Sequence, residues 1–361
     1  MLTPLFIIVA IAALGFLIVV HEGGHYFVAR WCRMRIERFS IGFGPGLLKR
    51  TSKKTGTTFQ LAPIPFGGFV EIRGMNIAED VDPDDKFAYP NRPVWQRFLT
   101  IFAGPATNYL SAIVLAFAIY AIHGIDTPTW WGVSSVVENR YDVQGYHFDA
   151  YGRLERGDRI TQLNGQPLFI NSSLSDRINQ SKDTPVTLTI ERDGRTFDVK
   201  LRPQQTKDNA GHPIWIIGVN LEHQDRVDEV GVGEALRQAL IYPVEQTKVI
   251  GRVLYGVVSG SEKADPGGPV RMVEEFYKAF SISTVEGIKL LMLLSVYLGL
   301  FNLLPIPALD GGRLVFLIYE MVTRRRANPK IETMVHMAGI MALGVVMLVV
   351  LYIDLRRVIH L

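Results

Sequence analysis

Four long apolar runs divide the chain, at residues 2–20, 98–122, 282–304 and about 334–353. The first run carries no charged side chain. Its length is enough to cross roughly 30 Å of hydrocarbon as a helix that rises about 1.5 Å per residue. The pattern predicts a polytopic α-helical membrane protein with four transmembrane helices.

The first apolar run could also be interpreted as a cleaved signal peptide. However, no basic residue precedes it, and His21 and Glu22 follow it directly where an Ala-x-Ala-like cleavage site would stand. We therefore expect a retained transmembrane helix.

Lys and Arg are concentrated in two of the loops between these runs. Lys49 and Arg50 are examples from the loop after the first run, and residues 324–326 after the third run are all arginine. Excess basic residues in short loops mark the cytoplasmic side. Both of these loops are therefore expected on the cytoplasmic side, with the two termini and the long middle segment on the outer side of the membrane. Arg356 and Arg357 in the tail argue mildly against this orientation.

Residues 124–225 alternate between apolar and polar positions, which is typical of strands with one buried face. Two dipeptides, Asn164-Gly165 and Asp193-Gly194, suit the positive φ angles of tight hairpin turns. The second turn separates the alternating residues 186–190 from 197–201, and residues 172–179 could form a short helix. This segment is expected to be an inserted extracytoplasmic α+β domain.

The stretch LERGDRITQLNGQPL within this domain resembles a circularly permuted PDZ domain of the bacterial type. Another small β domain is the alternative. The family usually has Ala-Gly-Leu two residues before Gly-Asp, whereas Tyr151-Gly152-Arg153-Leu154 carries an extra residue here. Binding of a peptide carboxylate is therefore not carried over from the resemblance.

Two further segments combine apolar and polar residues. Residues 226–281 contain a helical apolar spacing, so they could lie on the outer membrane surface or pack against the β domain. Residues 41–75 are rich in Gly and Pro but include strand-like runs on both sides of a basic turn. They predict a membrane-associated β-hairpin that lines a cavity on the cytoplasmic side. The expected parts of the chain are thus 1–123, 124–225, 226–281 and 282–361.

The amino-acid composition limits which binding partners and metal ligands the chain can have. The chain is 48% hydrophobic and 20% charged with a net charge of +3, which suits a mixed membrane and aqueous protein and gives little support to nucleic-acid binding. Its one cysteine, Cys32, can form neither an intrachain disulfide nor a cysteine-rich metal site. Histidine and carboxylate groups must therefore supply any metal ligands.

The residues after the first apolar run fit the metalloprotease pattern H-E-x-x-H. His21 and His25 are four residues apart and share a helix face, so both imidazoles can reach one ion, with Glu22 beside them as the catalytic base. We place this motif at the end of the first transmembrane helix. A shared Zn²⁺ would compensate for ionisable groups that are costly at that position.

A catalytic zinc usually has three protein ligands and one open position. The best third candidate is Asp310, because the predicted topology puts it and the two histidines at the cytoplasmic ends of antiparallel helices. The alternative role for Asp310 is to cap a helix that begins at Gly311.

Three motifs together resemble the site-2 protease family: HEGGH in the first span, AGPATN at 103–108 in the second, and NLLPIPALDGG in the third. With the PDZ-like insertion they are similar to its bacterial members of the RseP (regulator of sigma E protease) type. Those members often have two tandem PDZ domains, whereas this chain has room for one.

The resemblance implies intramembrane cleavage of single-pass membrane proteins, such as an anti-sigma factor or a signal-peptide-like segment. An upstream site-1 protease often makes a first cut outside. By matching positions, His21, His25 and Asp310 would bind zinc, Glu22 would be the base, and Asn302 would contact the substrate backbone or the oxyanion. The remaining expected substrate-binding residues are Pro305, Pro307, Gly67 and Gly68, the last two on the hairpin that would pair with the unwound substrate. Asn108 would support the site, with core packing as an equal account.

Two other functions fit parts of the pattern. One is a PDZ-containing membrane scaffold with a non-catalytic metal site. The other is an ion transporter, because His and Asp within a membrane also mark ion paths.

Overall fold

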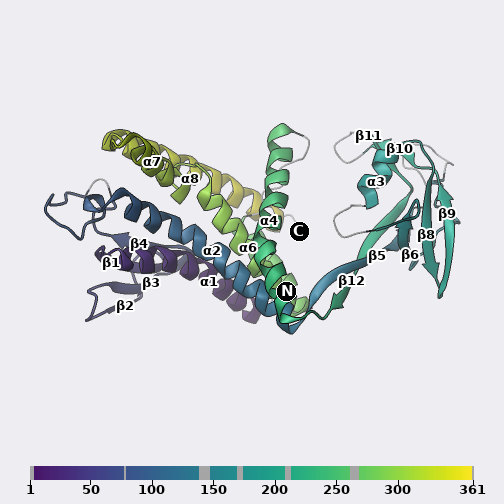
Figure 1. Cartoon of the computed structure of the whole chain (residues 1–361), viewed down its shortest axis with the longest axis horizontal. Helices are drawn as coiled ribbons and strands as arrows, with labels where there is room; N and C mark the ends of the chain where they lie inside the picture. The colour runs from purple at the N-terminus through teal and green to yellow at the C-terminus, as the bar shows by residue number, and fades with distance from the viewer. Residues whose placement is uncertain are drawn as a thin grey trace. The chain divides into compact units, whose positions relative to one another are not determined.

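The computed structural model describes residues 4–76, 79–137, 147–168, 174–207, 213–260 and 268–359. The chain forms two compact units (Figure 1). Unit 1 combines Met1–Ile122 with Gly231–Leu361, and unit 2 is His123–Val230.

Among the described residues of unit 1, four helices are long and apolar enough to cross a membrane. They are α1 (Pro4–Trp31), α2 (Val94–Ile122), α6 (Thr284–Leu303) and α8 (Pro329–Ile359). Each contains one of the apolar runs, as expected for a membrane protein with four such helices.

The end of the first helix was predicted wrongly. The helix does not stop at the H-E-x-x-H motif but continues to Trp31, where Arg33 with a φ of 58° turns the chain. The last turns of the helix are stabilised because Ala29 is fully buried in a cluster with Met34, Ile36 and Ile72. Ile36 and Ile72 belong to the sheet that follows the helix. The histidines therefore lie within the helix.

The segment predicted as a hairpin at 41–75 is a larger sheet. Its strands are β1 (Ile36–Phe43), β2 (Leu48–Thr51), β3 (Thr58–Leu61) and β4 (Ile64–Ile72), in the order β2-β3-β1-β4. Gly42 and Gly44 have φ angles of 88° and 106°, which redirect the chain after β1. The chain can then fold β2 and β3 along one side of β1, while β4 pairs with the other side. As a result, β4 is a terminal strand of this sheet.

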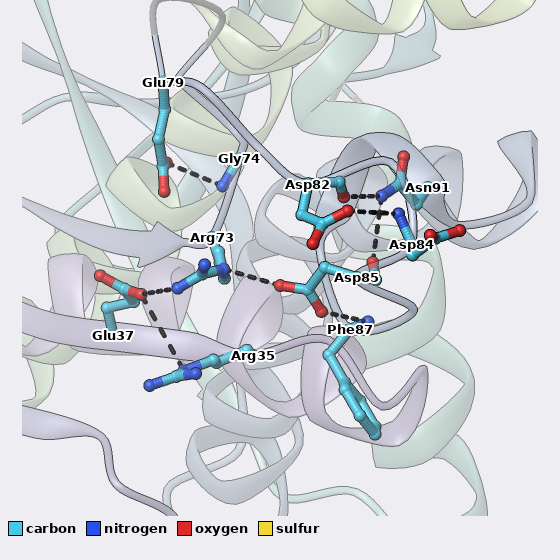
Figure 2. Close-up of polar contacts among 10 residues, drawn as sticks. All are labelled: Arg35, Glu37, Arg73, Gly74, Glu79, Asp82, Asp84, Asp85, Phe87 and Asn91. Atoms are coloured by element: carbon cyan, nitrogen blue, oxygen red, sulfur yellow. Dashed lines mark hydrogen bonds and ion pairs between the residues drawn. The ribbon is translucent and has the colours of Figure 1, made fainter.

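The connection from β4 to α2 is held by a polar network (Figure 2). Arg73, at the end of β4, contacts Glu37 of β1 at 3.4 Å and Asp85 of the connection at 2.7 Å. Asn91 donates to the backbone carbonyls of Asp82 and Asp85 at 3.0 Å each. The network fixes the end of β4 relative to β1.

The remaining helices of unit 1 are α4 (Val232–Ser259), α5 (Pro269–Ile282) and α7 (Asp310–Thr323). The predicted amphipathic segment 226–281 thus contains two helices, α4 and α5. On α4, Ala239 and Ile250 are buried with residues of α2 and α6. The apolar face of α4 therefore covers these two helices of unit 1, while its predicted place at the outer membrane surface stays a prediction.

Unit 2 is built on a six-stranded sheet with the order β12-β5-β6-β8-β9, where β7 pairs with β6. Its elements are β5 (Ile125–Val136), β6 (Arg159–Leu163), β7 (Gln166–Pro167), α3 (Leu174–Ser181), β8 (Val186–Arg192), β9 (Arg195–Leu201) and β12 (Val219–Asp228). A separate hairpin joins β10 (Gln204–Lys207) and β11 (Pro213–Ile216).

Both predicted turns of unit 2 form. Asn164-Gly165 and Asp193-Gly194 have positive φ angles and join paired strands. The expectation of one buried face on β9 was only partly right, because Leu201 is buried while Phe197 is 36% exposed. Near the turn, β9 is an outer strand that extends past the core.

Candidate metal centre

The two histidines of the motif project from one face of α1. His21 is 8% and His25 is 7% exposed, and their Nε2 atoms lie 3.3 Å apart. The rings meet edge to face with an interplanar angle of 84°. Two buried imidazoles thus present neighbouring nitrogen atoms to the same point.

Asp310 joins them from the first turn of α7. Its Oδ2 atom is 3.1 Å from His21 Nε2 and 3.3 Å from His25 Nε2. The predicted alternative was wrong, since Asp310 is the first residue of α7 and its side chain does not cap the helix; the cap residue is Leu309. The three groups do come together, but Asp310 reaches the histidines from α7 and not from the end of the third span.

The spacing of these three atoms fits zinc. Zinc bonds of about 2.0–2.1 Å in a tetrahedron require ligand atoms separated by roughly 3.3 Å. The three separations here are 3.1, 3.3 and 3.3 Å. Asp310 Oδ2 is buried and makes no hydrogen bond to any described residue. A cation between the three atoms would satisfy this oxygen and explain the close approach.

The Asp310 carboxyl is electrostatically prepared for a cation. Burial alone would raise its pKa, but His25 and His21 beside it outweigh burial and hold the pKa well below its usual range. Asp310 is therefore ionised at neutral pH.

The helix α2 orients both rings through their Nδ1 atoms. His25 Nδ1 lies 2.8 Å from the backbone carbonyl of Thr100, to which Nδ1–H donates a hydrogen bond, and this tautomer leaves the Nε2 lone pair free for a metal. His21 Nδ1 lies 2.9 Å from Asn108 Nδ2, while Asn108 Oδ1 is buried without a partner among the described residues. Turning this amide over would give His21 the acceptor it needs and also satisfy the oxygen. Asn108 thus contacts the site directly.

Small residues let α2 approach this closely. A Cβ atom at Gly104 would lie 2.3 Å from His25 Nε2 and 3.0 Å from His21 Cε1. One at Gly24 would lie 2.3 Å from the carbonyl oxygen of Ala103. The sequence reasoning did not single out Gly104 or Thr100. The AGPATN run contained a signal for Gly104, because a glycine inside a transmembrane helix often marks close packing.

Glu22 lies next to the metal ligands but is not one of them. It hydrogen bonds to the backbone of Val70 in β4. A Cβ at Gly68 would lie 3.3 Å from Glu22 Cγ and 2.7 Å from Ile18 Cγ2, so this glycine allows β4 to rest on α1. The terminal strand and the expected base are therefore held side by side.

These groups border a cavity of about 830 Å³. Its walls come from α1, β4, α6, α7 and α8, and include His21, Glu22, His25, Gly67, Gly68, Asn302, Asp310 and His336. Asn302 donates to the backbone carbonyl of Leu298 one turn earlier, at 3.0 Å. Pro305 and Pro307 are not among the lining residues; Pro307 instead packs against Gly339 of α8.

The turn before Asp310 depends on two glycines. A Cβ at Gly311 would lie 1.9 Å from the carbonyl oxygen of Leu304, and one at Gly312 would lie 2.6 Å from that of Ile306. Ala308 has a φ of 78°, which is unusual for a residue other than glycine. The Gly-Gly pair lets α7 begin directly on this turn, which delivers Asp310 to the histidines.

Residues 9–347, which include every part of this site, match the family model "Peptidase family M50". The chain belongs to peptidase family M50. The resemblance to the site-2 proteases is thereby confirmed, and this M50 peptidase is a zinc metalloprotease.

Relatives cover almost the whole M50 peptidase. A Rickettsia conorii protein named as a zinc metalloprotease is 30% identical over 95% of this chain and 96% of its own length. The regulator of sigma-E protease RseP of Escherichia coli is 27% identical over 96% of this chain and 97% of its own length. A solved PDZ domain of an SdrC-like protein from Listeria monocytogenes matches 26% of this chain with 21% identity and a TM-score of 0.21. The PDZ assignment of unit 2 stays a prediction.

Proposed function

We propose that this M50 peptidase cleaves transmembrane segments of single-pass membrane proteins, with His21, His25 and Asp310 as zinc ligands and Glu22 as the base. One observation carries the proposal. The three ligand atoms meet in a cavity that is bordered by a terminal β-strand and by three of the four apolar helices. A substrate embedded in the bilayer requires a catalytic site that lies among membrane-spanning helices, and this site meets that requirement.

Bound zinc would polarise the scissile carbonyl and lower the pKa of water toward about 7. The residues of the chain do the remaining work. Glu22, next to His21 and facing the cavity, takes the proton from the attacking water and later gives it to the leaving amine. Asn302 contacts the substrate backbone or the oxyanion, a role supported by its position in the cavity wall formed by α6.

The β4 strand solves a second problem of intramembrane cleavage. A transmembrane helix ties up its own backbone groups, so the scissile bond becomes accessible only when that helix unwinds. The free edge of β4 offers replacement hydrogen bonds to an extended segment, and Gly67 and Gly68 of this strand line the cavity. Substrate therefore adds to β4 as a new strand next to Glu22.

As substrate we propose an anti-sigma factor that a site-1 protease has already trimmed outside the membrane. The regulation of sigma-E in the name of the E. coli relative supports a regulatory role of this kind. Signal-peptide-like segments are the other candidate class. The distribution of Lys and Arg supports an inner-membrane orientation with both termini and unit 2 in the periplasm and the metal centre near the cytoplasmic side.

Glu22→Gln tests the proposal. The purified variant and the wild type are reconstituted in liposomes with a tagged single-pass substrate that lacks an outer domain, and cleavage and bound zinc are both measured. The matched control is Glu245→Gln, because Glu245 is exposed and its ion pair joins only Lys248 of the same helix.

We expect Glu22→Gln to retain zinc and to cleave about 10²- to 10⁴-fold more slowly, while the control cleaves normally. Normal turnover by Glu22→Gln would remove the proposed base. Retained zinc in Asp310→Ala would remove the proposed third ligand.

A further inference from the structure

The sheet of β1–β4 lies beside the C-terminal half of α1, and its two ends lie at different heights along that helix (Figure 1). Ile72, the last residue of β4, is buried in a cluster with Ala29 near the end of α1. Earlier in the same strand, a Cβ at Gly68 would lie 2.7 Å from Ile18 Cγ2. Ile18 lies roughly 20 Å of helix before Trp31, at about 1.5 Å per residue. One end of the sheet is therefore level with the end of α1, and the other with the middle of its apolar part.

The end of α1 has the composition of a segment at a membrane surface. Phe27 and Trp31 are both largely exposed, and Arg30 belongs to the last turn. Tryptophan is enriched where the hydrocarbon meets the headgroups, and Arg near a helix end reaches toward them. The end of the sheet that is level with Trp31 is therefore expected at the depth of the lipid headgroups.

The exposed side chains of the sheet follow this difference in height. At the end far from Trp31 they are large and apolar: Phe43 pairs with Ile64, and Leu48 pairs with Leu61. At the other end, the turn between β2 and β3 lies next to Thr58, which pairs with Arg38 near the beginning of β1. Along β2 toward this turn, and within it, the exposed side chains include Lys49, Arg50, Lys53 and Lys54.

These four basic residues have no acidic neighbour to balance them. Residues 38–70 contain neither Asp nor Glu, and none of the four makes an ion pair within the part of the chain that the structure describes. Lys and Arg can also protect the free edge of a terminal strand such as β2. Edge protection does not explain why large apolar side chains are exposed at the opposite end. An apolar end and a basic end on one surface match the two layers of a lipid leaflet.

We propose that Lys49, Arg50, Lys53 and Lys54 bind the phosphate groups of anionic phospholipids, while the apolar end of the sheet lies among the acyl chains. The aliphatic stems of Lys and Arg can cover the neighbouring apolar surface, so their charges reach the headgroups. This inference goes beyond the proposed function and requires only that α1 crosses the bilayer.

Energy transfer from the turn to labelled lipids tests the inference in the full-length protein. A donor fluorophore is attached to Ser52→Cys, and the natural Cys32 is buried and should remain unlabelled. Liposomes of phosphatidylcholine contain a trace of acyl-labelled acceptor, either phosphatidylglycerol or phosphatidylcholine. The measured quantity is the ratio of transfer to the two acceptors.

Three sets of substitutions are compared with wild type in this assay. The first changes all four basic residues to Gln. The second changes Lys49, Lys53 and Lys54 to Arg and therefore keeps the charge. The matched control removes the same charge from four exposed basic residues of unit 2, namely Arg156, Lys182, Arg195 and Lys200, which are also changed to Gln.

Wild type should transfer at least about twofold more to phosphatidylglycerol, because each basic residue near the surface attracts anionic lipid. The four-Gln variant should show a ratio of about one, with its helical circular dichroism and zinc content unchanged. The Arg variant and the unit 2 control should keep the wild-type ratio. Raising the salt concentration to about 1 M should bring the wild-type ratio close to one, because the attraction is electrostatic.

Equal transfer to both lipids in wild type would overturn the inference. A preference for phosphatidylglycerol that persists in the four-Gln variant would also overturn it, because other residues would then bind the lipid. Loss of the preference in the unit 2 control would replace a local site by an effect of net charge. Normal cleavage by Glu22→Gln would contradict the proposed function but leave all of these ratios unaffected, so the two proposals fail separately.

Discussion

Replacing Gly104 by alanine should abolish zinc binding although it substitutes none of the three zinc ligands. In an exposed helix, a Gly→Ala change stabilises by about 1 kcal/mol. Here the added Cβ would lie 2.3 Å from His25 Nε2, so the ring would have to move by about 1 Å to reach van der Waals distance. Metal–ligand distances tolerate only about 0.2 Å. The displacement is several times that tolerance, so His25 should cease to be a ligand.

Zinc affinity measures this effect directly. Purified protein is titrated with a chelator, and the zinc retained per chain is determined by atomic spectroscopy. We expect Gly104→Ala to bind zinc at least about 100-fold more weakly than wild type, beyond the usual effect of altering a group that only supports a ligand. Its helical circular dichroism should be unchanged.

Gly15→Ala is the control for this experiment. Gly15 belongs to the same helix as the histidines, but a Cβ there meets no atom within 4 Å. This variant should bind zinc as wild type does. If Gly104→Ala also held one zinc with wild-type resistance to the chelator, the close packing of α2 against the two rings would not control the metal site.

Three other changes test separate parts of the structure. Asp310→Ala should lose stoichiometric zinc, which spectroscopy of the dialysed protein would show; full occupancy would contradict the ligand set. Asn108→Leu should weaken zinc binding about 10- to 100-fold by leaving His21 Nδ1 without its partner, and an unchanged chelator titration would favour plain core packing. Arg73→Ala, which breaks two ion pairs of a 31% exposed side chain, should lower stability by roughly 1 kcal/mol in thermal unfolding. Arg35→Ala, 62% exposed and 4.0 Å from the same carboxylate, should cost under about 0.5 kcal/mol, and an equal loss in both would refute the role given to the network.

The ligands of the metal centre could be predicted because their geometry is encoded locally. The four-residue spacing of His21 and His25 fixes a shared helix face, and the alternating direction of the spans placed Asp310 near them. Thr100 could not be found in this way, because its contribution is a backbone carbonyl that any residue type could present. Gly104 was missed for a related reason: its function is to lack a side chain.

The fold was predictable to the extent that each element carries its own pattern. The four apolar helices and the two turns of unit 2 follow from composition and dipeptide chemistry. The pairing of β1 with both β3 and β4 does not, because a strand pattern identifies neither the partner nor the parallel arrangement. The packing partner of α4 could not be predicted either, because an apolar helix face does not identify the surface that it covers. In the structure that face packs on α2 and α6.

The contact between α1 and α2 also determines how a substrate can approach. At the depth of the histidines, Gly24 packs directly against the backbone of Ala103, and the Thr107 hydroxyl donates to the carbonyl of Val20 at 2.9 Å. No room for a third polypeptide is left between these two helices there. In the function proposed above, a segment diffusing in the bilayer therefore reaches the cavity from a side other than this contact, where β4, α6, α7 and α8 form its walls. The contact between α1 and α2 that holds the histidines in place thus also closes one side of the enzyme to a substrate in the membrane.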